Sequence, residues 1–273
     1  MKKTALMIAV LVTIVSVGCA SLPPSGPGTS PSPTRADAER AADLYSLGLI
    51  AFNAGNLDVS LDYVNQALAF SEIDGQTRLK MRLLRAEVYT DLEKYDLAQA
   101  EIDGLIAESP DSADVYFVSG LLNYKTRNMT PAVRDLTQAL AINSSFARAQ
   151  NLLGNIAKER GDFEKALAWY NEAVTSDDTF APAYFNRAEV DMALGYYDSA
   201  LSDYSSAIAR YSELQTNYLA QAYCGRGEAF LMKGDLDMSR RDQEKADSLV
   251  PGVCVEEKHT GPRWGKGEIQ LPR

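Results

Sequence analysis

Small residues recur along this 273-residue chain with a period of 34, and this feature most limits how the chain can fold. Units that begin at residues 79, 113, 147 and 181 follow one another at that spacing. The first and last units begin at residues 41 and 220, and their offsets are longer (79 − 41 = 38 and 220 − 181 = 39) because of short insertions. A regular repeat of this length predicts stacked, equivalent supersecondary units rather than one globular core.

Two positions in every unit are occupied by a small side chain. The eighth position holds Gly48, Ala86, Gly120, Gly154, Ala188 and Gly227. The twentieth holds Ser60, Ala98, Ala132, Ala166, Ala200 and Ser239. Two antiparallel helices approach closely only where neither carries a bulky side chain, so these positions predict the crossing point of a helical hairpin. Position 27 is alanine in five units and Leu105 in the second, and it predicts the contact with the next hairpin.

Glycines mark the turn between the two helices in four units. They are Gly55, Gly161, Gly195 and Gly234, and each suits the left-handed residue that ends a helix. The second unit has Glu93-Lys94 at this place and the third has Arg127-Asn128. The conformation of those two turns therefore stays open.

In period and in small-residue positions, about 210 of the 273 residues resemble the tetratricopeptide repeat (TPR) family. The resemblance implies an all-α solenoid of six helix-turn-helix repeats over residues 36–251, wound into a right-handed superhelix. Gln243 and Asp247 stand where an earlier unit has Leu136 and Leu140, as expected of a polar terminal cap. We expect residues 252–273 to be a C-terminal tail.

The start of the chain resembles a bacterial lipoprotein signal. Lys2 and Lys3 precede an apolar run over residues 5–17, which is too short for the roughly 20 residues of a membrane-spanning helix. Gly18 precedes Cys19 as in a lipobox, although Ser16 replaces the usual leucine. We expect residues 1–18 to be removed and Cys19 to be lipidated. An ordinary secretory signal is the alternative.

Residues 19–35 contain five of the eleven prolines and read as an extended tether.

The composition argues against catalysis and against nucleic-acid binding. The net charge is −10, so a polyanion would be repelled. His259 is the single histidine and has no second imidazole for a metal site or a nucleophile-base pair. "GPRWGKG", which starts at Gly261, lacks the spacing and the Ser or Thr of a phosphate-binding loop. We expect no enzyme activity, no cofactor and no metal.

The resemblance implies a ligand groove on the first helices of the repeats. Its first half would be apolar, with Tyr45, Leu49, Phe52, Leu83, Phe117, Leu121 and Tyr124. Its second half would be polar, with Arg148, Asn151, Asn155, Asn186 and Glu189, together with Lys158. Exposed apolar surface of this kind is typical of a binding site. The alternatives are that Leu49 and Leu121 are covered by the curvature of the superhelix, by the tether folding back or by self-association, and that the polar residues are simply solvated.

The polar half is only partly similar to the family's carboxylate clamp. Asn155 and Asn186 match its asparagines, whereas Asn151, Gln221 and Gly225 replace its cations. An extended peptide held by its backbone is therefore the expected ligand there.

Cys224 and Cys254 remain after lipidation of Cys19. In an exported protein they either form a disulfide or are two independent thiols.

These features together predict a lipid-anchored scaffold or adaptor of the bacterial cell envelope, on the outer membrane and facing the periplasm. Its partners would be envelope proteins, bound as an amphipathic helix or an extended peptide. Two alternatives stay open: a hydrophobic-ligand-binding component of a transport system, and an adhesin displayed on the cell surface.

Overall fold

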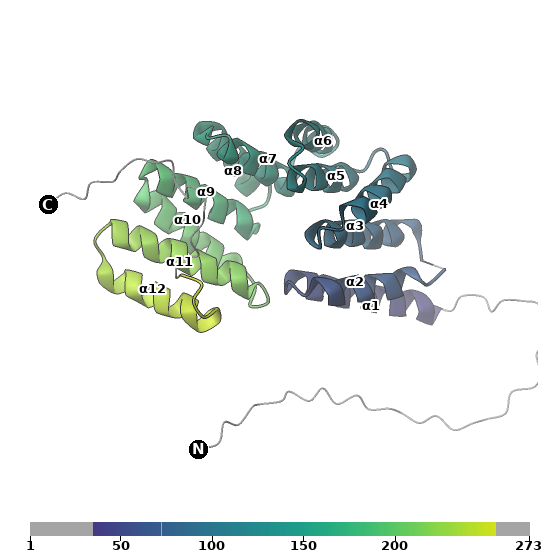
Figure 1. The fold of residues 1–273 in the computed structure, drawn as a ribbon, viewed down its shortest axis with the longest axis horizontal. Coiled ribbons are helices and arrows are strands. Elements are labelled where there is room, and N and C mark those ends of the chain that lie inside the picture. Colours follow the sequence, from purple (N-terminus) through teal and green to yellow (C-terminus); the bar gives the residue numbers. More distant parts are fainter. Residues whose placement is uncertain (1–34, 72, 255–273) are drawn as a thin grey trace, which may run out of the picture. The chain divides into compact units, whose positions relative to one another are not determined.

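A computed structural model describes residues 35–71 and 73–254 (Figure 1). Within these ranges the chain forms twelve helices and no strand, so the expected all-α class is confirmed. The first six helices are α1 (Arg35–Asn53), α2 (Leu57–Leu68), α3 (Gly75–Asp91), α4 (Tyr95–Glu108), α5 (Ala113–Lys125) and α6 (Met129–Ile142). The last six are α7 (Ala147–Glu159), α8 (Phe163–Ser176), α9 (Ala181–Leu194), α10 (Tyr197–Arg210), α11 (Thr216–Met232) and α12 (Leu236–Leu249).

Several sequence predictions lie outside the described residues. They are the signal peptide, the lipidation at Cys19, most of the tether, and the tail beyond Cys254. None of the described helices combines the length and the apolar character that crossing a membrane requires.

The helices pack as six consecutive hairpins, from α1 with α2 to α11 with α12. The second helix of each hairpin also contacts the first helix of the next, and first helices contact one another along the chain. Three first helices, α5, α7 and α9, begin at the residue where the repeat pattern starts a unit. Helix α3 begins four residues before its unit (79 − 75 = 4), where the side chain of Asp74 caps it by accepting a hydrogen bond from the backbone N–H of Thr77.

Small residues at positions eight and twenty are the crossing points, as predicted. A Cβ atom added to Gly48 would lie 3.0 Å from Val64, and one added to Gly154 would lie 2.4 Å from the ring of Tyr170. The hydroxyl of Ser60, at position twenty, donates a hydrogen bond of 2.8 Å to the carbonyl of Gly48, at position eight. The backbones of the two helices therefore touch at this point of the hairpin.

All six turns contain a left-handed residue at the same place. The four predicted glycines have φ between +76° and +83°. Glu93 and Arg127 take this conformation in the second and third units, with φ of 58° and 63°. The packing of the hairpin therefore imposes the turn even where the sequence supplies no glycine.

Leu105, the exception at position 27, is fully buried and belongs to a cluster that extends from α3 to α7. Its larger side chain fills the space between hairpins instead of preventing their contact. In the last hairpin, Gln243 and Asp247 are exposed on α12, as expected of a terminal cap.

Candidate interaction surface

The thirteen predicted groove residues lie on the first helices α1, α3, α5, α7 and α9, and we call this set the first-helix face. Its apolar half is less exposed than the sequence predicted. Leu83 and Phe117 are buried, with 8% and 4% of their surfaces exposed. The other five apolar-half residues, Tyr45, Leu49, Phe52, Leu121 and Tyr124, are half-buried and pack against core side chains. Half-buried leucines and aromatic rings therefore form the accessible apolar surface.

Arg148 explains the burial of Phe117. Its guanidinium lies 4.3 Å from the centre of the Phe117 ring and donates hydrogen bonds to both carboxylate oxygens of Glu87. Glu87 belongs to α3, Phe117 to α5 and Arg148 to α7, so this cluster joins three successive first helices. We call it the Arg148 clasp. No signal in the sequence indicated it, because Glu87 and Arg148 are 61 residues apart.

Each amide or charge of the polar half has a partner in the chain itself. Asn186 donates to Asn151 at 2.9 Å, and the amino group of Lys158 donates to Glu189 at 2.6 Å. Asn155 accepts a hydrogen bond of 2.7 Å from the hydroxyl of Tyr170. A peptide that bonds to these side chains must replace these contacts.

Tyr124, at the end of the apolar half, donates a hydrogen bond to Glu159 of α7, which also accepts one from Arg127. Burial and then the Glu159 carboxylate raise the pKa of Tyr124 above its ordinary value. The hydroxyl therefore stays protonated at neutral pH and acts as a donor.

Gly225 shows why the clamp similarity fails in the last unit. A Cβ atom at this position would lie 2.5 Å from the ring of Tyr204 in α10. A lysine or arginine, which the clamp would need here, cannot fit without displacing that ring.

Cys224 and Cys254 form a disulfide, with their Cα atoms 5.5 Å apart. The bond joins α11 to the segment after α12, so the alternative of two independent thiols is wrong. It fixes the start of the C-terminal tail to the last hairpin.

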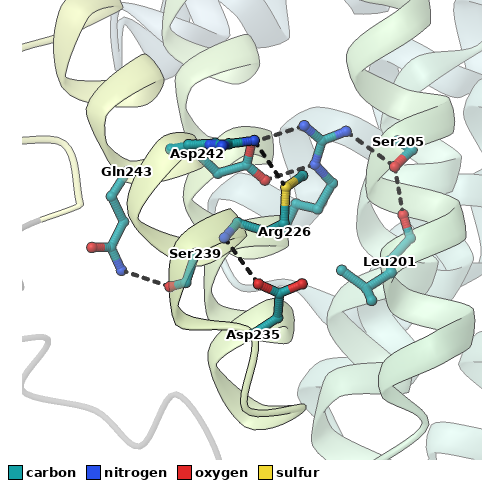
Figure 2. Close-up of polar contacts among 9 residues, drawn as sticks. Leu201, Ser205, Arg226, Asp235, Ser239, Asp242 and Gln243 are labelled. Atoms are coloured by element: carbon teal, nitrogen blue, oxygen red, sulfur yellow. Dashed lines mark hydrogen bonds and ion pairs between the residues drawn. The ribbon is translucent and has the colours of Figure 1, made fainter.

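Sequence reasoning missed a repeated ion pair away from the first-helix face. Arginine at position seven pairs with an acid at position 23 of the same unit in Arg85–Glu101, Arg187–Asp203 and Arg226–Asp242. The same arginines also donate to position 25 of the preceding unit, at Asn65, Asn171 and Ser205. Figure 2 shows Arg226 between Asp242 and Ser205. These residue types recur at fixed repeat positions, so aligning the units could have revealed the pair.

Beside one of these pairs lies a depression of about 540 Å³ between α8, α9 and α10. We call it the Asp191 depression. Its lining residues are Leu167, Asn171, Arg187, Asp191, Asp198, Ser199, Ser202 and Asp203. Asp191 is only 7% exposed, and burial, followed by repulsion from Asp203, raises its pKa to about 6. Sequence reasoning did not single out this residue.

No group of three or more His, Cys, Asp or Glu side chains suited to a metal ion occurs within the described residues.

Comparison with known proteins identifies the repeat. Residues 154–195 match the family model described as a TPR repeat. Human DnaJ homolog subfamily C member 7 is 27% identical over 182 residues, which are 61% of this chain and 36% of that protein. The chain thus spans about a third of the length of this relative.

Two solved structures share the arrangement of helices. A thermophilic TPR protein of Thermus thermophilus is 21% identical, with a TM-score of 0.55 over 67% of this chain and 98% of that one. PilW, described as a widely conserved type IV pilus biogenesis factor, is 18% identical, with a TM-score of 0.56 over 80% of this chain and 95% of that one. The fold is therefore a TPR-repeat fold, which is typical of scaffolds for protein–protein interaction.

Proposed function

We propose that this TPR-repeat chain is a lipid-anchored scaffold or adaptor of the bacterial cell envelope, and that it binds partner proteins through its first-helix face. The observation that carries the proposal is the set of half-buried leucines and aromatic rings on the first helices, with Tyr45 and Leu49 on α1 and Leu121 and Tyr124 on α5. Partly exposed leucines and aromatic rings suit the apolar side of a partner helix or an extended segment.

The proposed location rests on two observations. The N-terminal sequence resembles a lipoprotein signal that ends at Cys19, followed by a proline-rich tether. The fold is similar over most of its length to PilW, a pilus biogenesis factor. Attachment to the outer membrane with the array in the periplasm would place the first-helix face beside other envelope proteins.

The polar half would bind less readily than the apolar half, because its side chains already have hydrogen-bond partners within the chain. A partner peptide gains there only the difference between its own hydrogen bonds and those it replaces. We therefore propose that the apolar half provides most of the affinity and that Asn151, Asn155 and Asn186 orient an extended segment.

Photo-crosslinking in cells tests this function. Probes replace Tyr45 and Leu121 on the first-helix face, and a control probe replaces Gln138, which is exposed on the second helix α6. We expect one envelope protein to be captured from both face positions and not from Gln138. Lipid in place of protein at Leu121 would favour the transport-system alternative and contradict the scaffold.

The anchor and the location are tested separately. Cys19→Ala should release the protein from membranes, and retention would contradict lipidation. The array should resist protease added to intact cells and become sensitive once the outer membrane is opened. Cleavage on intact cells would favour the surface adhesin.

A further inference from the structure

The Asp191 depression contains a largely buried aspartate whose carboxylate has no direct ion-pair partner within the described residues. More than nine-tenths of Asp191 is buried, and its side chain lines the depression. No hydrogen bond or ion pair joins its carboxylate to any other residue between 35 and 254 that the structure describes. The carboxylate oxygens reach solvent only through the depression, so a cation that enters the depression can contact them directly.

The neighbouring cation cannot neutralise Asp191. Arg187 directs its Nε and Nη2 atoms to the two oxygens of Asp203, at 2.6 and 2.7 Å, and its Nη1 atom to Asn171. The guanidinium of Arg187 is therefore bonded to Asp203, and Asp191 has no ion pair with it. The depression has a local excess of negative charge.

Comparison with the other units shows that the repeat does not need this acid. Position eleven is neutral elsewhere, with Ala51, Tyr89, Asn123, Ala157 and Phe230. In the third unit Asn123 donates a hydrogen bond of 2.9 Å to Asp135, the acid at position 23. Asp191 replaces that donor with a second acceptor beside Asp203. The fifth unit therefore lacks the hydrogen bond that Asn123 makes in the third unit, and it has a carboxylate at the same position.

We infer that the Asp191 depression binds a lysine or arginine side chain of a partner polypeptide. The cationic head would pair with Asp191, the hydroxyls of Ser199 and Ser202 would accept further hydrogen bonds, and the aliphatic stem would lie on Leu167. A side chain on a polypeptide fits better than a free amine because the depression is shallow and open, which leaves room for the chain that carries it. The net charge of −10 favours the approach of a basic partner.

This site is separate from the first-helix face. Arg187 and Asp191 occupy positions seven and eleven of α9, whereas Asn186 and Glu189 occupy positions six and nine on the first-helix face. A partner at either surface leaves the other available.

Peptide binding to the full chain, solubilised in detergent, tests the inference. The probe is a short fluorescein-labelled peptide of alternating lysine and serine, titrated by fluorescence anisotropy. Asp191→Asn should weaken binding about tenfold, the value of one charge-assisted hydrogen bond. The matched control Asp58→Asn removes an equal charge from an exposed site on α2 and should change the affinity less than about twofold.

Equal effects of the two variants would overturn the inference, because they would show attraction by net charge alone. Free lysine amide that binds as tightly as the peptide would overturn the polypeptide as occupant. A second probe is the same peptide with its lysines acetylated, which should bind the natural chain more weakly. Ser202→Tyr keeps every charge but fills the depression, so it should abolish the difference in affinity between the two peptides. Asp191→Asn should keep the fold, since Asn123 occupies the equivalent position in the third unit.

Discussion

Gly154 of α7 lies against the ring of Tyr170 in α8, which is fully buried and donates a hydrogen bond to Asn155. The repeat pattern predicted this contact, because a glycine at position eight faces a small residue at position twenty in the same unit. It could not predict that the tyrosine at position 24 would cover the glycine. Side-chain direction within a hairpin depends on packing and not only on spacing.

Gly154→Ala should lower the free energy of unfolding by about 1–2 kcal/mol. The new methyl group would lie 2.4 Å from the ring of Tyr170, which the hydrogen bond to Asn155 holds in place. The free-energy cost of this overpacking exceeds the gain in helix propensity from glycine to alanine. Chemical denaturation measures the change. Gly75→Ala is the control, since nothing lies within 4 Å of a Cβ atom there. An unchanged midpoint for Gly154→Ala would mean that the two helices do not cross at this residue.

Asp191 makes stability depend on pH. Its pKa is raised from 3.8 to about 6, so between these values the folded chain holds a proton that the unfolded chain has lost. The free energy of unfolding therefore falls as pH rises through this range. Burial and then Asp203 raise this pKa, whereas Arg187 opposes the shift.

Asp191→Asn removes that penalty. We expect it to raise the free energy of unfolding by about 1–2 kcal/mol at pH 7, a value reduced from the full shift because the depression is open to water. At pH 4 the variant and the natural chain should be equally stable. Denaturation at both pH values provides the measurement, and an equal change at both would exclude titration of Asp191 as the cause.

At the scale of elements, the turns show where sequence preferences and packing disagree. Four glycines indicated the left-handed residue correctly, but Glu93 and Arg127 take the same conformation. Local preference could not predict them, because a side chain disfavours this region by roughly 1–2 kcal/mol. Contacts between the paired helices supply the free energy that holds those two turns.

Glu93→Gly should therefore stabilise the second hairpin. Relief of the backbone strain exceeds the added entropy of a glycine in the unfolded chain, so we expect a gain of about 0.5 kcal/mol. Gly161→Ala is the reverse test in the fourth unit, where φ is +77° and no atom lies near the Cβ position. It should lose about 1 kcal/mol. Thermal unfolding compares the two variants, and a loss in Glu93→Gly would indicate a contact of the glutamate itself.

At the scale of the whole array, the period of the sequence predicted the six hairpins and their order, but it did not predict the chemistry of the first-helix face. The pairs that cover this face join residues 31, 35 and 61 positions apart, and they connect different units. Matching positions within one repeat cannot reveal contacts that depend on how successive repeats are placed. The polar groups predicted on this face are instead bonded to other residues of the chain.

The Arg148 clasp should couple the units that it joins. Arg148→Met keeps an alkyl chain over Phe117 but leaves Glu87 buried without its partner, so we expect a loss of about 2 kcal/mol. Adding Glu87→Gln removes the unpaired charge and should restore more than half of that loss. Hydrogen exchange should quicken in α3, α5 and α7 of the single variant and stay unchanged in α12, because repeat arrays transmit stability between neighbours. If protection from hydrogen exchange fell uniformly along the array, the twelve helices would unfold as one unit. The clasp would then stabilise the entire array and not only its middle.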